Sequence, residues 1–394
     1  MRSISERSIY TDLMRKFRDN GHQLYIVTPC ERRDKQSTQV IESDGAYILS
    51  VKTLNVQKTN VIEKGLGQVS LEFLYQRAIK KHFAGVRFDL ILYSTPPITI
   101  TKVIESAKRQ NPQAVTYLLL KDIFPQNAVD LGMLSKSGLK GVLYKSFRKK
   151  EKKLYSLSDY IGCMSPANVR YLLEHNPEID SKKVEIAPNS IELNISVDNR
   201  QFKDQTILEK YNLPVDKPIL IYGGNLGKPQ GIPFLIECLD ANIQRSDCHF
   251  LIVGDGYEYQ KLESWYKEKQ PKNVTIMRRL PKDDYDKLVQ ACHVGLICLD
   301  YRFTIPNFPS RLLSYLEYSM PIIVTSDSNS DMGPIAQENG FGYWCLSNDV
   351  NAFTQCLDNM LASDISAMGE KGYRFLCEDY LIENTYSAIM KHLK

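Results

Sequence analysis

Apolar side chains along this chain follow two spacings, one typical of helices and the other of strands. Ile9, Leu13 and Phe17 recur every four residues and predict an early helix, and the apolar run at 23–28 predicts a short strand. The same alternation continues along the chain, with apolar runs of strand length separated by helical segments. It indicates an α/β protein built on parallel sheets.

One polar segment interrupts this alternation. Residues 190–217 contain few apolar side chains, and the pattern restarts at 219–222. A chain of 394 residues is also too long for one ordinary core. We therefore expect an α/β domain over 1–189, a linker over 190–217, a second α/β domain over 218–362 and a last helical stretch over 363–394.

The beginning of the sequence departs from the usual order of such a domain. A parallel α/β domain usually opens on a buried strand, whereas Ser3 and Glu6 form a capping-box pattern and a helix follows at once. We therefore expect a first domain that lacks its first strand, either by nature or because the natural start lies upstream. The alternative is that another strand takes that place.

Composition excludes several classes of protein. Hydrophobic residues make up 43% of the chain and charged residues 24%, which excludes a disordered, collagenous or coiled-coil protein. No apolar run approaches the roughly 18 residues that span a bilayer, and no signal-peptide core follows Met1. Nine scattered cysteines without a CxxC pair indicate reduced thiols in a cytoplasmic protein, and neither they nor the six histidines suggest a metal site.

Charge is distributed unevenly along the chain. Residues 1–190 carry 30 Lys and Arg against 19 Asp and Glu, a balance of +11, whereas residues 191–394 carry 20 against 27, a balance of −7. The first half is therefore expected to meet something anionic. Nucleic acid, phospholipid headgroups and a phosphorylated substrate all fit this observation.

The strongest local signal for ligand binding is a glycine-rich segment in the second half. An apolar strand at 219–222 runs into Gly223, Gly224 and Asn225, Lys228 follows, and a helix starts near 231. Glycines allow the backbone to approach a phosphate closely, and Lys228 and the amides of the helix start can meet its charge. The alternative is a tight turn without a ligand.

Two other segments place polar side chains at the expected edge of the same sheet. Arg279 follows an apolar strand and could reach a nucleotide, because ligands of open α/β sheets bind at the carboxyl ends of strands. Ser310 and Arg311 lie at a helix start, where the helix dipole favours an anion. Ser314 and Glu317 are three residues apart on that helix, so a carboxylate there could hold ribose hydroxyls, or Glu317 could be a solvated helix residue.

Taken together, these segments resemble the two-domain GT-B glycosyltransferases. The matching pieces are 187–189, 222–231, 254–256, 279–281 and 309–321, and the resemblance covers about 7–390. Within that class the chain is similar to the retaining family 4 enzymes of bacterial surface polysaccharides, in particular the fucosamine transferases of O-antigen and capsule pathways.

The resemblance implies an architecture and a reaction. It implies two Rossmann-like domains facing across a cleft, with the acceptor in the first domain and a nucleotide-sugar, expected to be UDP-linked, in the second. It also implies a C-terminal helix that crosses back to the first domain. The reaction would be a retaining glycosyl transfer that needs neither a metal nor a further cofactor.

The sequence departs from the family pattern at the residues that grip the donor. The family's Arg and Lys after the first strand of the second domain fall at Asn225 and Gln230, which leaves Lys228 and Arg311 to meet the diphosphate. The family's two glutamates fall at Pro306 and Ser314. Glu317 lies one turn further on and would replace them only in part.

The family also places a residue of the catalytic cleft near a strand end of the first domain. The apolar strand at 116–120 ends in Lys121 and Asp122. The resemblance implies that Lys121 meets phosphate or sugar and that Asp122 meets the acceptor. The alternative is an ordinary surface salt pair.

A basic cluster lies in the first half of the chain. Residues 145–153 contain six cations in nine positions. Such a run is by default a solvated helix face, but each cation near anionic lipid also adds about 1 kcal/mol of binding. Since the family's acceptors are often polyprenyl-linked, we predict peripheral binding at the inner face of the plasma membrane through Phe147, Arg148, Lys149, Lys150, Lys152 and Lys153.

The leading hypothesis is a glycosyltransferase that moves a sugar from a nucleotide-sugar to a saccharide or lipid-linked saccharide in surface polysaccharide biosynthesis. A non-hydrolysing nucleotide-sugar 2-epimerase is an alternative, but it would need clustered carboxylates and histidine. A second alternative is a non-catalytic protein of the same fold that binds a nucleotide-sugar or a partner. Nucleic acid is not expected as a partner, because the basic cluster lacks regularly interleaved aromatic residues.

Overall fold

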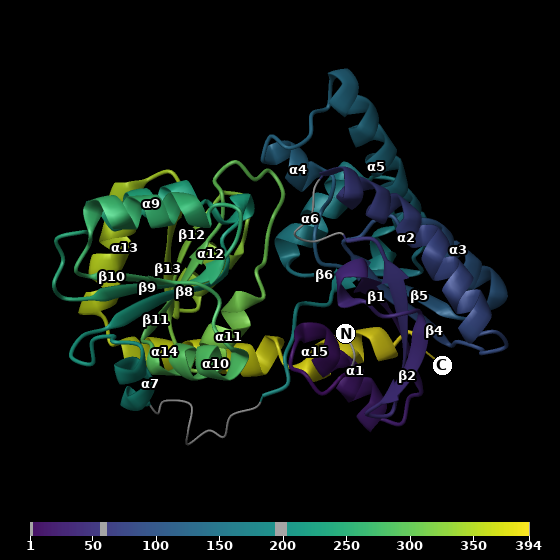
Figure 1. Ribbon diagram of the computed structural model, residues 1–394, viewed down its shortest axis with the longest axis horizontal. Helices are drawn as coiled ribbons and strands as arrows, with labels where there is room; N and C mark the ends of the chain where they lie inside the picture. Colours follow the sequence, from purple (N-terminus) through teal and green to yellow (C-terminus); the bar gives the residue numbers. More distant parts are fainter. Residues whose placement is uncertain (1–2, 56–60, 194–202, 394) are drawn as a thin grey trace. The chain divides into compact units, whose positions relative to one another are not determined.

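The computed structural model describes residues 3–55, 61–193 and 203–393. Contacts divide the chain into two compact units. The first unit contains Met1–Glu192 and Ile382–Lys394, and the second contains Leu193–Leu381. Alternating strands and helices build both units (Figure 1), so the α/β class expected from the sequence is confirmed.

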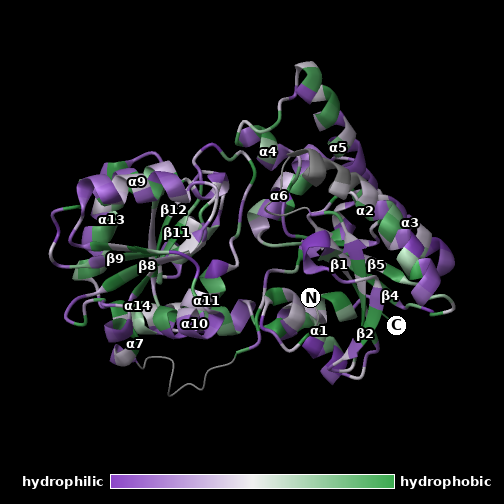
Figure 2. Ribbon diagram, in the orientation of Figure 1, coloured by the Kyte–Doolittle hydropathy of each residue, from purple (hydrophilic) through white to green (hydrophobic). Residues whose placement is uncertain are grey.

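The second unit is built on a parallel sheet of six strands in the order β10-β9-β8-β11-β12-β13. Its strands are mostly unbroken apolar runs, and Figure 2 shows hydrophobic residues along β8 and β9. Helices cover both faces of the sheet, which is why both faces of its strands are buried. The strands are β8 (Ile219–Asn225), β9 (His249–Asp255), β10 (Val274–Met277), β11 (Val294–Cys298), β12 (Ile322–Ser326) and β13 (Gly342–Leu346).

The helices of the second unit lie in two layers. In Figure 1, α9 and α13 lie on one side of the sheet, and α10, α11 and α14 lie on the other. The apolar core on the first side includes Leu220, Phe250, Trp265 and Phe353. The helices are α7 (Gln205–Lys210), α8 (Ile232–Ala241), α9 (Tyr259–Lys269), α10 (Lys282–Ala291), α11 (Arg311–Glu317), α12 (Met332–Glu338), α13 (Val350–Ala362) and α14 (Ile365–Asp379).

The first unit contains two separate sheets. The order of the first is β1-β3-β2, with β1 (Leu24–Glu31) parallel to β3 (Ala46–Thr53) and β2 (Gln39–Ser43) antiparallel to it. The second is parallel, in the order β4-β5-β6-β7. Its strands are β4 (Leu90–Thr95), β5 (Val115–Leu120), β6 (Tyr160–Cys163) and β7 (Val184–Ile186).

Helices pack on both sheets of the first unit. The helix predicted from Ile9, Leu13 and Phe17 is present as α1, and Leu13 and Phe17 are buried in a core that also contains Tyr117. The helices of this unit are α1 (Ile9–Asp19), α2 (Val61–His82), α3 (Thr101–Gln110), α4 (Gln126–Asp130), α5 (Gly138–Leu157), α6 (Pro166–His175) and α15 (Ile382–Met390).

The hairpin formed by β2 and β3 was not expected from the sequence. Its turn consists of Asp44 and Gly45, which have φ angles of 53° and 76°. Two consecutive residues with positive φ form the type of tight turn that suits the twist of a β-hairpin, and Asp-Gly is a strong signal for it.

The last helical stretch differs from the single helix expected over 363–394. It consists of two helices that belong to different units, because the chain leaves the second unit between Leu381 and Ile382. Phe375, Leu376 and Tyr380, in the first part of this stretch, belong to the second unit, and only the part from Ile382 onward belongs to the first.

The final helix, α15, packs on α1 in the first unit. Ile382 and Ile389 are buried in the same core cluster as Leu13 and Phe17. Polar contacts add to this packing, because Lys16 Nζ pairs with Glu383 Oε1 at 2.7 Å. His392 lies just beyond α15, and its ring stacks on the ring of Tyr160. Its Nε2 atom lies 3.0 Å from Glu185 Oε1.

Candidate functional site

The carboxyl ends of β8 and β9 lie very close together at the centre of the six-stranded sheet of the second unit. Gly224 pairs with Gly254, and a Cβ atom on Gly254 would lie 1.9 Å from the carbonyl oxygen of Gly224. Gly224 has a φ angle of +131°, which also favours glycine. Gly223 and Gly224, which were expected to follow the strand, therefore belong to β8 itself, and the turn begins after Asn225.

This edge is also the point at which the strand order of the sheet reverses. From β8 the chain continues to β9 and β10 on one side, and later to β11, β12 and β13 on the other side. Such a switch point leaves a crevice outside the carboxyl ends of the strands, where open α/β sheets bind ligands. The end of β8 is thus the position at which a ligand site is expected.

Arg311 is the cation that the fold brings to the end of β8. Its guanidinium carbon lies 4.3 Å from the centroid of the Tyr222 ring, and a Cβ atom on Gly224 would lie 2.4 Å from its Nη2 atom. Among the described residues, no carboxylate forms an ion pair with Arg311. Contact with Tyr222 positions the guanidinium, and without a carboxylate partner among these residues its positive charge is left for an anion.

Two further tyrosines surround the same point. Tyr315 donates its hydroxyl hydrogen to Ile221 O at 3.1 Å and accepts from Gly223 N at 3.2 Å. A Cβ atom on Gly223 would lie 1.9 Å from the hydroxyl of Tyr285. Burial raises the pKa of Tyr222 and of Tyr285 to about 12, so both remain neutral at physiological pH.

The turn after β8 is held by Gln230. Its Oε1 atom accepts a hydrogen bond from Gly227 N at 3.1 Å and another from Asn225 Nδ2 at 3.0 Å. The two residues at which the resemblance leads one to expect cations therefore bind each other. Lys228 in the same turn is exposed, and its Nζ atom lies 6.0 Å from the centroid of the Tyr257 ring.

The structure separates the other donor-site candidates. Arg279 is exposed two residues after β10, two strands away from β8. Sequence analysis did not single out its neighbour Arg278, which pairs with Asp255 Oδ1 at 3.1 Å and whose guanidinium carbon lies 3.9 Å from the centroid of the Tyr259 ring. Arg278 is the arginine that reaches the end of β9.

Ser310, Ser314 and Glu317 belong to the segment of the short helix α11. Ser310 and Ser314 are exposed, whereas the exposed fraction of Glu317 is 2%. The residues around Glu317 on this helix are also buried, so their packing draws it into the interior. Ser314 and Glu317 were expected to share a polar helix face, but of these two residues only Ser314 is accessible to a ligand.

Lys121 and Asp122 follow β5 in the first unit, as predicted. Lys121 Nζ donates to Ala187 O at 3.3 Å, and both oxygens of the Asp122 carboxylate accept from Asn127 Nδ2, at 2.9 and 2.7 Å. Both residues lie in the described part of the chain, and no ion pair joins them. The alternative of an ordinary salt pair is therefore wrong.

Burial changes the acidity of both groups. It lowers the pKa of the Lys121 ammonium group to about 7 and raises the pKa of the Asp122 carboxyl group to about 6. Two groups that change charge near neutral pH, at the carboxyl end of one strand, are suited to proton transfer or to binding a charged substrate.

The basic cluster on α5 is largely tied into the first unit. Arg148 donates to Glu151 Oε2 at 2.6 Å and to His175 O at 3.0 Å, and the exposed fraction of Glu151 is only 3%. Phe147 packs edge-on against Phe124 with ring centroids 5.0 Å apart. These contacts correct the expectation that the two side chains face a membrane.

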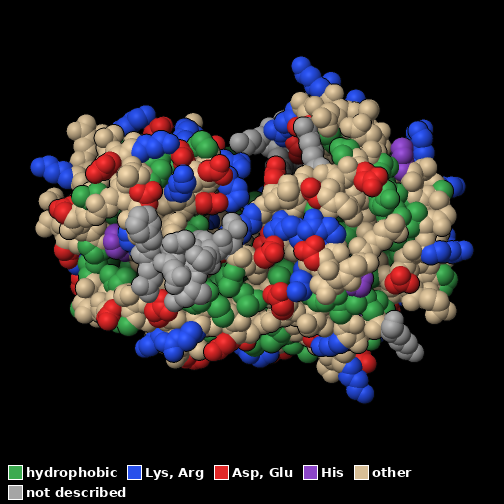
Figure 3. All heavy atoms as spheres, turned by 90° about the horizontal axis from the view of Figure 1, so that it is seen from below, with side chains coloured by type: hydrophobic (Ala, Val, Ile, Leu, Met, Phe, Trp, Pro, Cys, Tyr) green, Lys and Arg blue, Asp and Glu red, His purple; other side chains and the backbone are tan. Residues whose placement is uncertain are grey.

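The lysines of the cluster also differ from one another. Lys152 pairs with Glu178 at 2.9 Å and Lys153 with Glu105 at 3.3 Å, both at the surface. Lys149 is exposed and Lys150 is partly exposed. Figure 3 shows the molecule from below Figure 1, a face other than the projecting end of α5, and there too basic and acidic side chains lie next to one another.

An exposed apolar group lies at the beginning of α5, and sequence analysis considered only its member Leu143 as a residue that could enter lipid headgroups. The exposed fractions of Leu139, Val142 and Leu143 are 93%, 69% and 47%. Their spacing of three and four residues places them on one face of the helix, which the sequence could have shown. No helix among the described residues is both long and apolar enough to cross a membrane.

Solved structures of similar architecture identify the class. Sucrose-phosphate synthase from Thermosynechococcus elongatus has a TM-score of 0.75 at 15% identity, covering 97% of this chain and 91% of that one. WaaG, a glycosyltransferase involved in lipopolysaccharide biosynthesis, has a TM-score of 0.65 at 13% identity, covering 97% of this chain and 94% of that one. The fold is that of the GT-B glycosyltransferases, as the resemblance implied.

Sequence comparisons show similarity to glycosyltransferases. WbjE of Pseudomonas aeruginosa, described as a probable glycosyltransferase, is 23% identical over 328 residues, which are 82% of this chain and 78% of that protein. Residues 203–374 match the family described as Glycosyl transferases group 1. The chain is a glycosyltransferase, and its residues 203–374 are similar to that family.

Proposed function

We propose that this glycosyltransferase takes its sugar from a nucleotide-sugar bound at the carboxyl end of β8, with Arg311 and Lys228 meeting the diphosphate. The observation that carries the proposal is the guanidinium of Arg311, stacked on Tyr222 beside Gly224 and without a carboxylate partner among the described residues. A departing diphosphate is strongly anionic, and fixed cations lower the energy of a transition state in which that charge develops.

The first unit would supply the groups that act on the acceptor. We assign Lys121 to phosphate or sugar and Asp122 to the acceptor, because both groups change charge near neutral pH at the end of β5. The expected donor is UDP-linked, and the expected outcome is retention of configuration at the transferred sugar. Polysaccharide biosynthesis is the expected pathway, since WaaG is described as acting in lipopolysaccharide biosynthesis.

A binding and turnover experiment tests this proposal. The purified chain is screened for thermal stabilisation by UDP-, GDP- and dTDP-sugars, and the donor that stabilises it most is then incubated with saccharide acceptors. Stabilisation by a sugar nucleotide that Arg311→Ala abolishes would support the donor site. Stabilisation without transfer to any acceptor would favour the non-catalytic alternative, and an inverted product anomer in NMR spectra would exclude retention.

The exposed end of α5 favours an acceptor at a membrane surface. Figure 1 shows this end of α5 projecting from the rest of the first unit, and Figure 2 shows hydrophobic and hydrophilic residues side by side along it. Lys136, Lys140, Lys145 and Lys149 are exposed around the apolar face formed by Leu139, Val142 and Leu143. We assign this face to an anionic lipid bilayer, because apolar side chains can enter the headgroup layer while the lysines meet phosphate.

Sedimentation with vesicles tests the lipid assignment separately from the donor site. The chain should sediment with vesicles of phosphatidylcholine and phosphatidylglycerol at low salt, and less so at high salt. The double variant Leu139→Ser, Val142→Ser should remain in the supernatant. Val215→Ser changes an apolar side chain that is 49% exposed elsewhere and should sediment like the natural chain. A natural chain that stays in the supernatant with these vesicles at low salt would overturn the assignment.

A further inference from the structure

A carboxylate is buried at the carboxyl end of β12 in the second unit. Asp327 follows this strand directly, and its exposed fraction is 1%. Burial raises the pKa of this carboxyl group, and hydrogen bonds from Ser330 and Asn329 oppose that shift. Within the described residues, no cation pairs with it. Since a buried charge is costly unless it is compensated, the carboxylate depends on its hydrogen-bond donors.

Three donors from the turn after β12 surround the Asp327 side chain. Its Oδ1 atom accepts from Asn329 N and from Ser330 N, both at 2.8 Å. Its Oδ2 atom accepts from Ser330 Oγ at 2.8 Å, and the exposed fraction of Ser330 is 2%. The hydroxyl hydrogen of Ser330 therefore points to Asp327, and its oxygen remains an acceptor for another group.

The same turn binds the segment that leads from β11 to α11. Ser330 Oγ accepts from Asn307 N at 2.9 Å. Asn329 Nδ2 donates to Phe303 O at 2.7 Å. The turn after β12 therefore holds the segment 303–310 at two separate points, and Asp327 orients the hydroxyl that makes one of these bonds.

This segment ends where Arg311 begins α11. It contains two prolines, which restrict its backbone, and the ring of Phe308 is buried and stacks on Tyr380 with centroids 5.6 Å apart. A segment restricted in this way absorbs little movement. A displacement at Asn307 would therefore reach the beginning of α11 and the backbone of Arg311.

We propose that Asp327 and Ser330 are positioning residues of the donor site, which hold Asn307 so that the guanidinium of Arg311 lies beside the end of β8. The side chain of Arg311 already contacts Tyr222, so the turn after β12 would fix the backbone from which that side chain starts. Groups that bind a ligand need such support from hydrogen bonds behind them. The inference rests on the proposed donor site, because both residues would act through Arg311.

Ser330→Ala is the sharpest test, because it removes the bond to Asn307 and keeps the backbone hydrogen bonds of the turn. Calorimetry with UDP, GDP and dTDP first finds the nucleoside diphosphate that the natural chain binds most tightly. Ser330→Ala should weaken its binding about three- to tenfold, the size expected for one lost hydrogen bond. Asp327→Asn keeps an acceptor for the two backbone amides and should weaken it less than Asp327→Ala.

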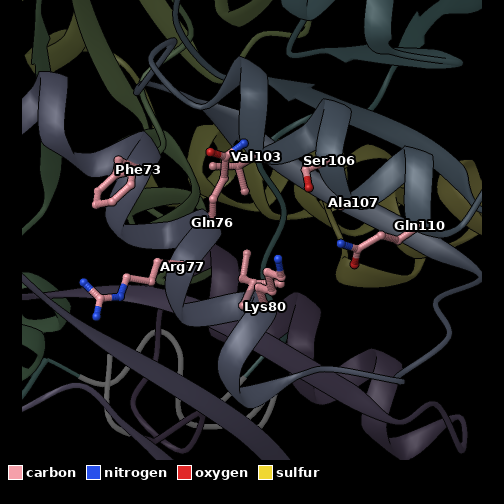
Figure 4. Close-up of a pocket in the computed structure, with 9 residues that line it drawn as sticks. Phe73, Gln76, Arg77, Lys80, Val103, Ser106, Ala107 and Gln110 are labelled. Atoms are coloured by element: carbon pink, nitrogen blue, oxygen red, sulfur yellow. The ribbon is translucent and has the colours of Figure 1, made fainter.

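Two other serines provide matched controls. Ser347, just beyond β13, is 1% exposed, and its Oγ atom has no hydrogen-bond partner among the described residues. Ser106 belongs to the first unit, where it lines a groove of about 440 Å³ between α2 and α3 (Figure 4). Ser347→Ala and Ser106→Ala should bind like the natural chain. A purely structural role of Ser330 would lower the thermal midpoint of Ser330→Ala and leave its binding well below that midpoint unchanged.

Combination with Arg311→Ala separates this inference from the donor site itself. If Ser330 acts through Arg311, Ser330→Ala should change binding by less than about twofold in a chain that already carries Arg311→Ala. A full further loss in the double variant, or unchanged binding in Ser330→Ala alone, would overturn the inference and leave the donor site in place. Unchanged binding in Arg311→Ala, or no binding of the three compounds by the natural chain, would overturn the donor site and the inference with it.

Discussion

The guanidinium group of Arg311 stacks on the ring of Tyr222, with its central carbon 4.3 Å from the ring centroid. Tyr222 is fixed in turn, because its hydroxyl donates to Asn225 O at 2.7 Å and its ring is fully buried. The arginine is therefore held in place before any ligand arrives. A site prepared in this way loses little side-chain entropy on binding.

Replacement of Arg311 should weaken donor binding. Arg311→Ala removes a charged hydrogen-bond donor, so we expect a loss of about 1–3 kcal/mol in the free energy of nucleotide-sugar binding. Arg311→Lys should recover part of that loss, since it keeps the charge but not the planar group. Calorimetry measures both, and Arg374→Ala, an exposed arginine on α14, is the control. Unchanged affinity in Arg311→Ala would remove this residue from the site.

A side chain at Gly254 should destabilise the second unit. The Cβ atom of Gly254→Ala would lie 1.9 Å from the carbonyl oxygen of Gly224, so β8 and β9 would have to move apart. We expect a loss of about 1–3 kcal/mol or more in the free energy of unfolding, as for other overpacked sites. Urea denaturation checks this value. Gly85→Ala has open space around its Cβ atom and only an unfavourable φ of +82°, so it should cost less.

Lys121 should make the stability of the first unit depend on pH. Its pKa is about 7 in the folded chain against 10.5 when unperturbed, so between these values the unfolded chain binds more protons than the folded chain. Stability should therefore rise as the pH increases from 7 to 10.5, with a slope of up to about 1.4 kcal/mol per pH unit. In urea denaturation at pH 7 and pH 9, Lys121→Met should show a smaller rise than the natural chain. The same rise in both proteins would contradict a buried ammonium group at this position.

Arg148 should contribute more to stability than to binding a surface. Its partner Glu151 is 3% exposed, so Arg148→Ala would leave a carboxylate without its ion pair in the interior. We expect a loss of about 3–5 kcal/mol in the free energy of unfolding, typical of breaking a buried pair. Lys149→Ala on the same helix should change it by less than about 0.5 kcal/mol. Equal effects of the two substitutions in thermal denaturation would show that Arg148 is only a surface cation.

The periodicity of apolar residues predicted the class of the fold because it reports burial. The strand that became β8 could be recognised from its apolar run, and α1 from the spacing of Ile9, Leu13 and Phe17. The end of the last helix in the second unit could not, because Tyr380 and Leu381 are apolar residues that would fit a continuous helix equally well. Only the packing of α15 on α1 separates the two helices.

The site was harder to predict because the sequence does not show which carboxylate a given Lys or Arg will contact in the fold. Lys152, Lys153 and Arg148 read as one basic cluster in the sequence, but each finds a different carboxylate in the fold. Arg278 and Arg279 are adjacent, and only the direction of the chain after β10 decides which of them reaches Asp255. The spacing of Leu139, Val142 and Leu143, in contrast, was visible in the sequence, which would have added Leu139 and Val142 to Leu143 as an apolar face.

The helix α15 gives the chain a fixed order of assembly during synthesis. Ile382 and Ile389 complete a core whose other members, Leu13 and Phe17, emerge from the ribosome at the very beginning. All residues of the second unit are translated before these two isoleucines. The core of the first unit can therefore be completed only after all residues of the second unit have been translated.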